Sequence, residues 1–263
     1  MRNYNTLTAM NLRTIQTMRY VTPLREGGSL PAIVEGDDDG LYVLKFRGAG
    51  QGTKALIAEL VAGEIARTLG FKIPEIVFVE LNTDLARTEP DPEIQDLIKG
   101  SGGLNLALDY LPGSIMYDPL IEKPSGELAS RIVWFDAFTA NVDRTPRNAN
   151  MLWWHNAVWL IDHGAALFYQ HDWDRFAENS ANPFKQIKDH MLLPFADQLE
   201  KVDGDMKEKI IPEVLKEIVG LIPDEWMERG KEDRSRYIEF LTNRLETSRN
   251  FVEEALDARN LHI

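Results

Sequence analysis

The sequence contains no cysteine among its 263 residues. Disulfide bonds, thiolate metal sites and cysteine nucleophiles are therefore excluded, and we expect a protein of the reducing cytoplasm. Basic residues are scarce, because 29 Lys and Arg stand against 42 Asp and Glu and give a formal net charge of -13. We therefore expect no general binding to nucleic acid or to an anionic membrane, since both require a basic surface.

Long apolar runs are missing as well. No stretch approaches the roughly 20 apolar residues that a membrane-spanning helix needs. The first residues lack the apolar core of a signal peptide. With 44% hydrophobic and 27% charged residues, the composition is ordinary for a globular protein with a substantial core. We expect a soluble, intracellular protein of one domain or two lobes.

The first part of the sequence is rich in predicted strands. Short runs of β-branched, aromatic and aliphatic residues, bounded by turn residues, predict strands at 17–22, 30–34, 41–46, 76–81 and 104–111. Apolar residues at helical spacing predict one helix from Thr53, as its cap, to Leu69, with Gly70 as the stop. A short helix is predicted at 92–99, in an acidic stretch, and Pro112-Gly113 is the candidate linker.

The second part is mainly helical in its patterns. A helix is predicted at 125–140, and further helices follow after residue 175, the clearest at 207–222 and 231–259. Between them, the apolar runs 151–154 and 158–161 predict a β-hairpin. A strand-rich part with one helix, followed by a helix-rich part with one hairpin, indicates an α+β fold.

The most informative segment runs from Asn141 to Gly164. A polar loop carries Asp143 and Asn148, and the hairpin's second strand ends on Asp162, after which Gly164 frees the backbone to turn. The hairpin therefore returns Asp162 to the neighbourhood of the loop. Two carboxylates and an amide at one place suit a divalent metal held against phosphate oxygens, which predicts phosphoryl transfer.

Other interpretations of this segment remain open. Asp143 and Asn148 also suit a plain Asx-rich turn, and Asn150 competes with Asn148 as a metal ligand. Arg144 and Arg147 either neutralise phosphate charge in the transition state or are exposed loop arginines. Asp162, at the end of an apolar strand, needs a cationic partner or a metal. His163 is expected only to pack or to cap the turn.

Lys45 lies within the apolar strand predicted at 41–46. By strand alternation it shares a face with Leu41 and Val43, so it is expected to point inward and to need a carboxylate or phosphate partner. The following helix offers Glu59, on a packed face, and Glu64, at the edge of another apolar face. The alternative is an edge-strand lysine beside two solvated glutamates.

A glycine-rich turn, Gly27-Gly28-Ser29, precedes this lysine and would let backbone amides approach phosphates, although a simple hairpin also explains it. The order of features is more informative than any one of them. A glycine-rich turn, a strand lysine, a helical glutamate, a linker, an Asp/Asn loop and a hairpin ending in Asp-x-Gly follow the order of a protein-kinase-like phosphotransferase.

At residues 135–173 the sequence resembles the HipA-like kinase family, a bacterial branch of the protein-kinase-like fold, and the resemblance extends more loosely over 18–195. It implies a two-lobed fold, with an N-lobe at 1–107, a hinge at 108–113 and a helical C-lobe at 114–263. It also implies ATP and Mg²⁺ as cofactors and, as acceptor, a protein Ser/Thr hydroxyl.

The resemblance also implies roles for individual residues. Asp143 falls at the catalytic aspartate, Asn148 and Asp162 at the metal ligands, and Lys45 at the phosphate-binding lysine, with Glu59 its helical partner. The turn at Gly27, Gly28 and Ser29 falls on the phosphate side, and Asp109, Tyr110 and Leu111 fall in the hinge that contacts adenine. Arg144 is placed with the catalytic residues.

Three departures accompany the resemblance. Asn-Val precedes Asp143 where eukaryotic protein kinases carry His-Arg, Asp-His-Gly replaces Asp-Phe-Gly, and the glycine-rich turn is shorter than the glycine loop of those kinases. A different class of function stays open, that of a pseudokinase-like module that binds nucleotide or protein without turnover. A lipid or small-molecule hydroxyl is an alternative acceptor.

Overall fold

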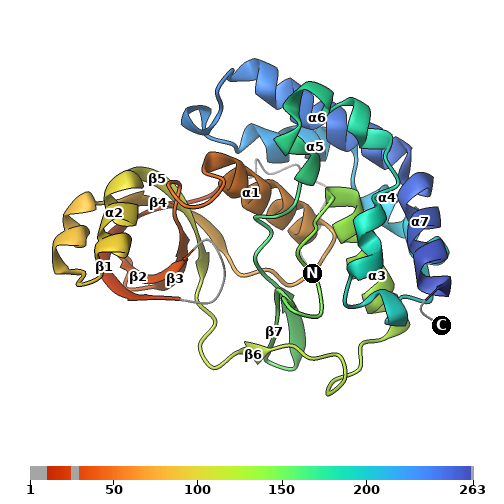
Figure 1. Cartoon of the computed structure of the whole chain (residues 1–263), viewed down its shortest axis with the longest axis horizontal. Helices are drawn as coiled ribbons and strands as arrows, with labels where there is room; N and C mark the ends of the chain where they lie inside the picture. Colours follow the sequence, from red (N-terminus) through yellow and green to blue (C-terminus); the bar gives the residue numbers. More distant parts are fainter. Residues whose placement is uncertain (1–10, 25–29, 262–263) are drawn as a thin grey trace.

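The structure is a computed structural model that describes residues 11–24 and 30–261. Its first part forms a five-stranded closed barrel, drawn in red to yellow on the left of Figure 1. The strands are β1 (Thr14–Pro23), β2 (Ala32–Gly36), β3 (Leu41–Lys45), β4 (Ile76–Leu81) and β5 (Gly103–Asp109), in the order β1-β2-β3-β5-β4. A parallel pairing of β1 with β4 closes the barrel, and the other pairs are antiparallel.

The five predicted strands are confirmed, with shifts at their ends. The strand β4 has the predicted bounds, whereas β5 ends at Asp109, two residues early. Alternation decides which face of β3 is buried: Tyr42 and Leu44 point into the barrel, and Lys45 lies on the opposite face with Val43. The helix α2 (Pro92–Gly100), capped by Asp91, and the 3₁₀ helix η1 (Thr83–Thr88) belong to this part of the chain.

The helix α1 (Thr53–Thr68) lies between the barrel and the C-terminal helices (Figure 1). Its N-cap is Gly52 rather than the predicted Thr53, whose hydroxyl instead donates to the carbonyl of Trp226 at 3.0 Å. Gly70, at a φ of 84°, ends the helix as predicted. The apolar residues of α1 belong to the larger of two cores, which it shares with the later helices. A tilt of α1 would therefore disturb both parts of the molecule.

The predicted hairpin is confirmed as β7 (Met151–Trp154) and β8 (Ala157–Leu160). His155 and Asn156, at φ values of 48° and 57°, form its two-residue turn, since two left-handed residues match the twist of paired strands. A two-residue strand that the sequence analysis missed, β6 (Ile115–Met116), pairs with β7. Before the hairpin, α3 (Gly126–Thr139) begins at its N-cap Ser125 and ends at Ala140, close to the prediction.

The C-terminal segment differs from the prediction. The residues expected as one helix at 207–222 belong to two helices, the first of which begins earlier, at Leu199, and the long helix expected at 231–259 is two shorter ones. The helices are α4 (Leu199–Lys209), α5 (Pro212–Gly220), α6 (Lys231–Glu246) and α7 (Ser248–Asn260). Pro212 starts α5 because it has no N–H to continue α4, and the extended Ile211 precedes it. Thr247 separates α6 from α7.

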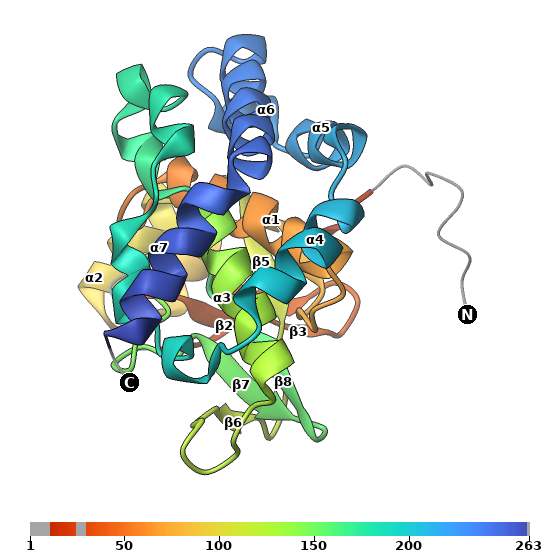
Figure 2. The same cartoon turned by 90° about the vertical axis from the view of Figure 1, so that its right-hand side faces the viewer.

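Residues 168–195 are also less helical than expected, since they form short 3₁₀ turns. These are η2 (Phe168–His171), η3 (Trp173–Arg175), η4 (Glu178–Ala181), η5 (Lys185–Asp189) and η6 (Leu193–Phe195), and η7 (Asp224–Trp226) follows later. Figure 2 shows α3 between α4 and α7, which it contacts. Within residues 11–24 and 30–261, no helix combines the length and the apolar character needed to cross a membrane.

A buried guanidinium joins these helices. Arg244 on α6 is fully buried, and its Nε donates to the carbonyl of Phe138 at 2.8 Å, at the end of α3. Its Nη1 donates to the carbonyls of Ser180 and Asn182, each at 3.0 Å. Burial lowers the pKa of Arg244 to about 10. A cation at the carboxyl end of α3 also faces the negative end of the helix dipole.

Replacing Arg244 should therefore destabilise the fold. We expect Arg244→Met to lower the free energy of unfolding by about 2–4 kcal/mol, because several buried carbonyls lose their donor. Urea denaturation measures this change. The control is Arg249→Met on α7, which removes an exposed ion pair with Glu253 and should cost less than about 0.5 kcal/mol. Equal losses in the two variants would contradict this account of the helical core.

Candidate active site

A cavity of about 1520 Å³ lies where the barrel meets the rest of the chain. Its walls come from β3, from residues 108–120, from the loop before β7, from the residues after β8 and from residues 191–195. The lining residues used below are Lys45, Asp109, Tyr110, Leu111, Arg147, Asn148, Asn150, Ile161, Asp162, Met191, Pro194 and Phe195. The cavity therefore collects side chains that lie far apart in the sequence.

Lys45 meets two carboxylates at this cavity. Its Nζ lies 2.7 Å from Oδ1 of Asp162 and 3.8 Å from Oε2 of Glu59, and its side chain is 10% exposed. Burial alone would lower the pKa of Lys45, but the attraction of Asp162 and Glu59 raises it above its usual value. Lys45 is therefore a buried, charged lysine that can face an anion.

Glu59 holds the turn that follows Asp162. Its carboxylate accepts the backbone N–H of His163 at 3.0 Å, and the ring Nδ1 of His163 lies 3.3 Å from Oε1. Burial would raise the pKa of Glu59, but Lys45 and His163 lower it below its usual value. Glu64, the other glutamate considered for Lys45, pairs instead with Arg67 at 3.2 Å. The pairing that the sequence left open is thus with Glu59.

Asp162 adopts a left-handed conformation, with φ at 53°. Gly164 was expected to make this turn, but it has no such angle, so the strain lies at Asp162 itself. The Asp162 side chain is 38% exposed and lies in the cavity wall. It is therefore paired with Lys45 while still open to a ligand.

The loop after α3 carries Asp143, whose Oδ2 accepts Nδ2 of Asn148 at 2.7 Å and Nδ2 of Asn150 at 3.2 Å. A carboxylate only accepts hydrogen bonds, so both amides turn their nitrogen to Asp143 and leave their oxygen for another partner. Burial raises the pKa of Asp143, and the charge of Asp162 adds to this rise. The two carboxylates are therefore electrostatic neighbours, as the hairpin predicted.

The donor set around Asp162 is suited to a hard divalent cation. Carboxylate and amide oxygens are the protein ligands that Mg²⁺ takes, and it binds through one or two carboxylates together with substrate phosphates. Among the described residues, no group of three or more His, Asp or Glu side chains could hold a metal ion by itself. The carboxylate of Asp162 and the amide oxygen of Asn148, both in the cavity wall, fit a cation shared with a phosphate ligand.

Residues 109–111, at and just after the end of strand β5, also line the cavity. The N–H of Asp109 donates to the carbonyl of Glu75 at 2.8 Å, and that of Tyr110 to Leu41 at 2.9 Å. The N–H of Leu111 has no partner within the described part of the chain. Gly27, Gly28 and Ser29 lie outside the described residues, although Leu24 and Pro31, on either side of them, line the cavity.

Comparison with protein families matches residues 18–255 to the HipA-like kinases. The chain belongs to the HipA-like kinase family. Membership of this family identifies the protein as a kinase. The prediction that it transfers a phosphoryl group is therefore confirmed. A comparison with curated protein sequences finds no match.

Solved kinase structures share the fold of this HipA-like kinase. The Helicobacter pylori proinflammatory kinase CtkA is 13% identical, with a TM-score of 0.53 over 95% of this chain and 99% of that one. Golgi casein kinase is 12% identical, with a TM-score of 0.51 over 95% of this chain and 74% of that one. The same kinase with Mn/ADP bound is 10% identical, with a TM-score of 0.50 over 95% and 75%. These likenesses establish an α+β, kinase-like fold.

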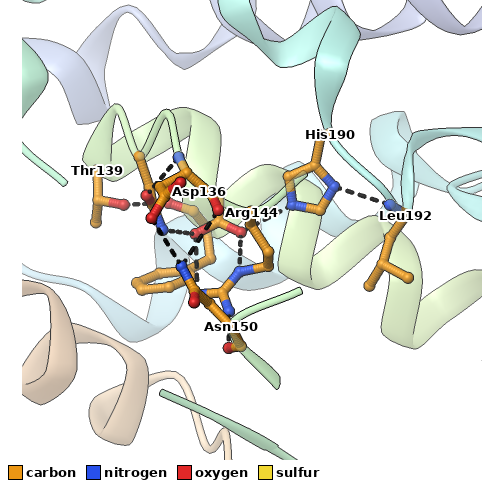
Figure 3. A network of polar contacts seen from close by, with 9 residues as sticks. Asp136, Thr139, Arg144, Asn150, His190 and Leu192 are labelled. Atoms are coloured by element: carbon orange, nitrogen blue, oxygen red, sulfur yellow. Dashed lines mark hydrogen bonds and ion pairs between the residues drawn. The ribbon is translucent and has the colours of Figure 1, made fainter. Parts of the chain in front are cut away.

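Arg144 of this HipA-like kinase does not lie where it was expected. It is 1% exposed, and its Nε donates to Oδ2 of Asp136 at 2.6 Å (Figure 3). A guanidinium held below the surface by a buried carboxylate cannot meet a phosphate in the cavity. The expectation that Arg144 neutralises phosphate charge is therefore wrong, whereas Arg147 does line the cavity.

Sequence reasoning also missed residues of the site. Asp136 and His190 lie in the buried network of Figure 3, joined at 2.8 Å, and Met191, Pro194 and Phe195 form a cavity wall. One signal was present, because an aspartate within the apolar helix sequence Trp-Phe-Asp-Ala-Phe must find a buried partner. Nothing local in the sequence connects residues 190–195 with the loop at Asp143.

The contacts of Glu59 generate a prediction for stability. We expect Glu59→Ala to lower the free energy of unfolding by about 2–4 kcal/mol, because the backbone N–H and ring of buried His163 lose their partner. Glu64→Ala, on the same helix, should cost less than about 1 kcal/mol, since it loses only a partly exposed ion pair. Urea denaturation of both variants measures the difference, and a reversed order would contradict the assigned contacts.

Proposed function

We propose that this HipA-like kinase is an ATP- and Mg²⁺-dependent phosphotransferase whose acceptor is a protein serine or threonine hydroxyl. The observation that carries the proposal is that Lys45, Asp162 and Asn148 line one cavity, with Asn148 hydrogen-bonded to Asp143. Nucleotide use gains support from the fold shared with a Golgi casein kinase that has Mn/ADP bound. We further propose that the barrel and the helical part act as two lobes, divided near residues 108–113.

The positions of the cavity residues support a specific role for each of them in the proposed reaction. Lys45 would bind the α- and β-phosphates, and Glu59 would keep Lys45 and the Asp162 turn in place. Asp143 would orient the acceptor hydroxyl and accept its proton, since its raised pKa makes it a better base than an exposed aspartate. The N–H of Leu111, which has no partner among residues 11–24 and 30–261, would donate to the adenine ring.

Asn148 and Asp162 would hold Mg²⁺, which supplies neutralisation of phosphate charge. Both ligands line the same cavity, Asn148 from the loop and Asp162 from the end of the hairpin. Phosphates bound to that Mg²⁺ would lie beside Asn148, whose amide also contacts Asp143. Catalysis would then depend on positioning and electrostatics more than on covalent chemistry.

Transfer of label from γ-labelled ATP, to the protein itself or to a mixed protein substrate, tests this function. We expect incorporation that requires Mg²⁺ and falls about 10²–10⁴-fold in Asp143→Ala, because the proton acceptor is lost. Asp162→Ala should be at least as impaired. Asp96→Ala, at an exposed pair with Lys99 on α2, is the control and should match the wild type.

The alternatives give different results in the same assay. Nucleotide binding without turnover, equal in wild type and both variants, would indicate a pseudokinase-like module. Turnover with lipid or small-molecule hydroxyls, but with no protein, would retain the kinase and replace the proposed acceptor. Phosphoamino-acid analysis of the labelled product identifies serine or threonine directly.

The metal ligand can be assigned by comparing Asn148 with Asn150. We expect Asn148→Ala to raise the half-saturating Mg²⁺ concentration at least about tenfold, because one ligand is lost. Asn150 has a φ of 46°, so Asn150→Gly removes its side chain without imposing a left-handed alanine, which would cost about 1–2 kcal/mol. Asn150→Gly should leave the Mg²⁺ requirement near that of the wild type. The opposite ranking would assign the metal to Asn150.

A further inference from the structure

A buried polar network, drawn in Figure 3, adjoins the candidate active site through Asn150, which lines the cavity. At its centre is Asp136 on α3, which is fully buried. Its carboxylate accepts Nε of Arg144 at 2.6 Å, Nε2 of His190 at 2.8 Å and Nδ2 of Asn141 at 2.9 Å. Every donor that meets this carboxylate comes from a segment outside α3, so Asp136 ties a rigid helix to the loop and to residue 190.

Arg144 connects Asp136 to the two elements proposed to bind the metal, which are the loop with Asn148 and the hairpin that ends at Asp162. Its Nη1 donates to the backbone carbonyl of Asn150, which also accepts the N–H of Ile161 at 3.1 Å. Ile161 immediately precedes Asp162, and the side chain of Asn150 donates to Asp143. The carbonyl of Asn150 therefore joins the loop to the end of the hairpin, and Arg144 holds this carbonyl in place by a hydrogen bond.

His190 attaches the third wall of the cavity to the same network. Its Nδ1 accepts the N–H of Leu192 at 3.0 Å, so the ring proton lies on Nε2 and is donated to Asp136. The neighbouring N–H of Met191 donates to the carbonyl of Arg144 at 3.1 Å. Met191, Pro194 and Phe195 line the cavity. One imidazole thus couples residues 191–195 to the loop that carries Asp143.

We propose that Asp136 and His190 are positioning residues for the bound magnesium nucleotide, an inference that rests on the proposed function. They touch neither substrate nor metal. They orient Arg144, and Arg144 sets the spacing between the loop with Asn148 and the hairpin with Asp162. Mutation of residues that hold metal ligands by polar contacts typically lowers metal affinity or activity about 10–100-fold, because the ligands are no longer held in one geometry.

The test compares His190→Asn with His190→Gln. The glutamine amide extends to the position of Nε2 and can still donate to Asp136, whereas the shorter asparagine amide lies near Nδ1 and serves only Leu192. Calorimetric titration with ADP, with and without Mg²⁺, measures how much the metal tightens binding. The tightening is the ratio of the ADP dissociation constants without and with Mg²⁺. We expect this ratio to fall at least about tenfold in His190→Asn, while the affinity for ADP without metal stays unchanged. His190→Gln should retain the tightening.

Melting temperatures separate positioning from a structural role. If His190 only filled space, both variants would lose stability alike and Mg²⁺ would tighten ADP binding as in the wild type. Arg144→Lys is the second variant, to be used also if His190→Asn does not fold. It keeps a cation for Asp136, but the single Nζ of lysine does not reproduce the separation between Nε, which serves Asp136, and Nη1, which serves the carbonyl of Asn150, so the same loss is expected.

Full Mg²⁺-dependent tightening in folded His190→Asn, or in Arg144→Lys, would overturn the inference and leave the proposed function intact. If Mg²⁺ does not tighten ADP binding even in the wild-type protein, the proposed function fails, and the inference fails with it. The wild-type titration therefore distinguishes the two failures before any variant is compared.

Discussion

The ion pair between Asp136 and Arg144 is the interaction on which the rest of the site depends. Both side chains are buried, so removing either partner would leave a charge without compensation. Nη1 of Arg144 donates to the carbonyl of Asn150, where the loop and the hairpin meet. The pair therefore holds the residues that face the cavity in a fixed position relative to α3, which lies in the helical core.

The contact between Glu59 and His163 plays the corresponding part on the barrel side. Glu59 lies on α1, which packs with the later helices, and it reaches both Lys45 on β3 and the turn after Asp162. With histidine in place of the phenylalanine of Asp-Phe-Gly, this turn gains a polar contact to the helix. The orientation of α1 and that of the Asp162 turn are thus linked by hydrogen bonds as well as by packing.

Local patterns predicted most of the elements, because strand alternation, helical spacing and turn residues act over a few neighbours. The hairpin and α3 were predicted nearly to the residue, and α1 to within one turn at each end. Errors arose where one residue decides between continuing and breaking a helix, as at Pro212 and Thr247. The strand β6 was missed because two residues carry no period, and only pairing with β7 defines it.

The sequence by itself determined the inventory of chemistry: one loop with Asp143 and Asn148, one hairpin ending on Asp162, one strand lysine, and no cysteine. Only the tertiary structure decided the partners. Lys45 could pair with Glu59 or Glu64, and Arg144 could face solvent or the core, with no local signal to separate these outcomes. Such choices depend on desolvation and on contacts between segments far apart in the sequence, such as Glu59 with His163, which are 104 residues apart, and no local pattern encodes them.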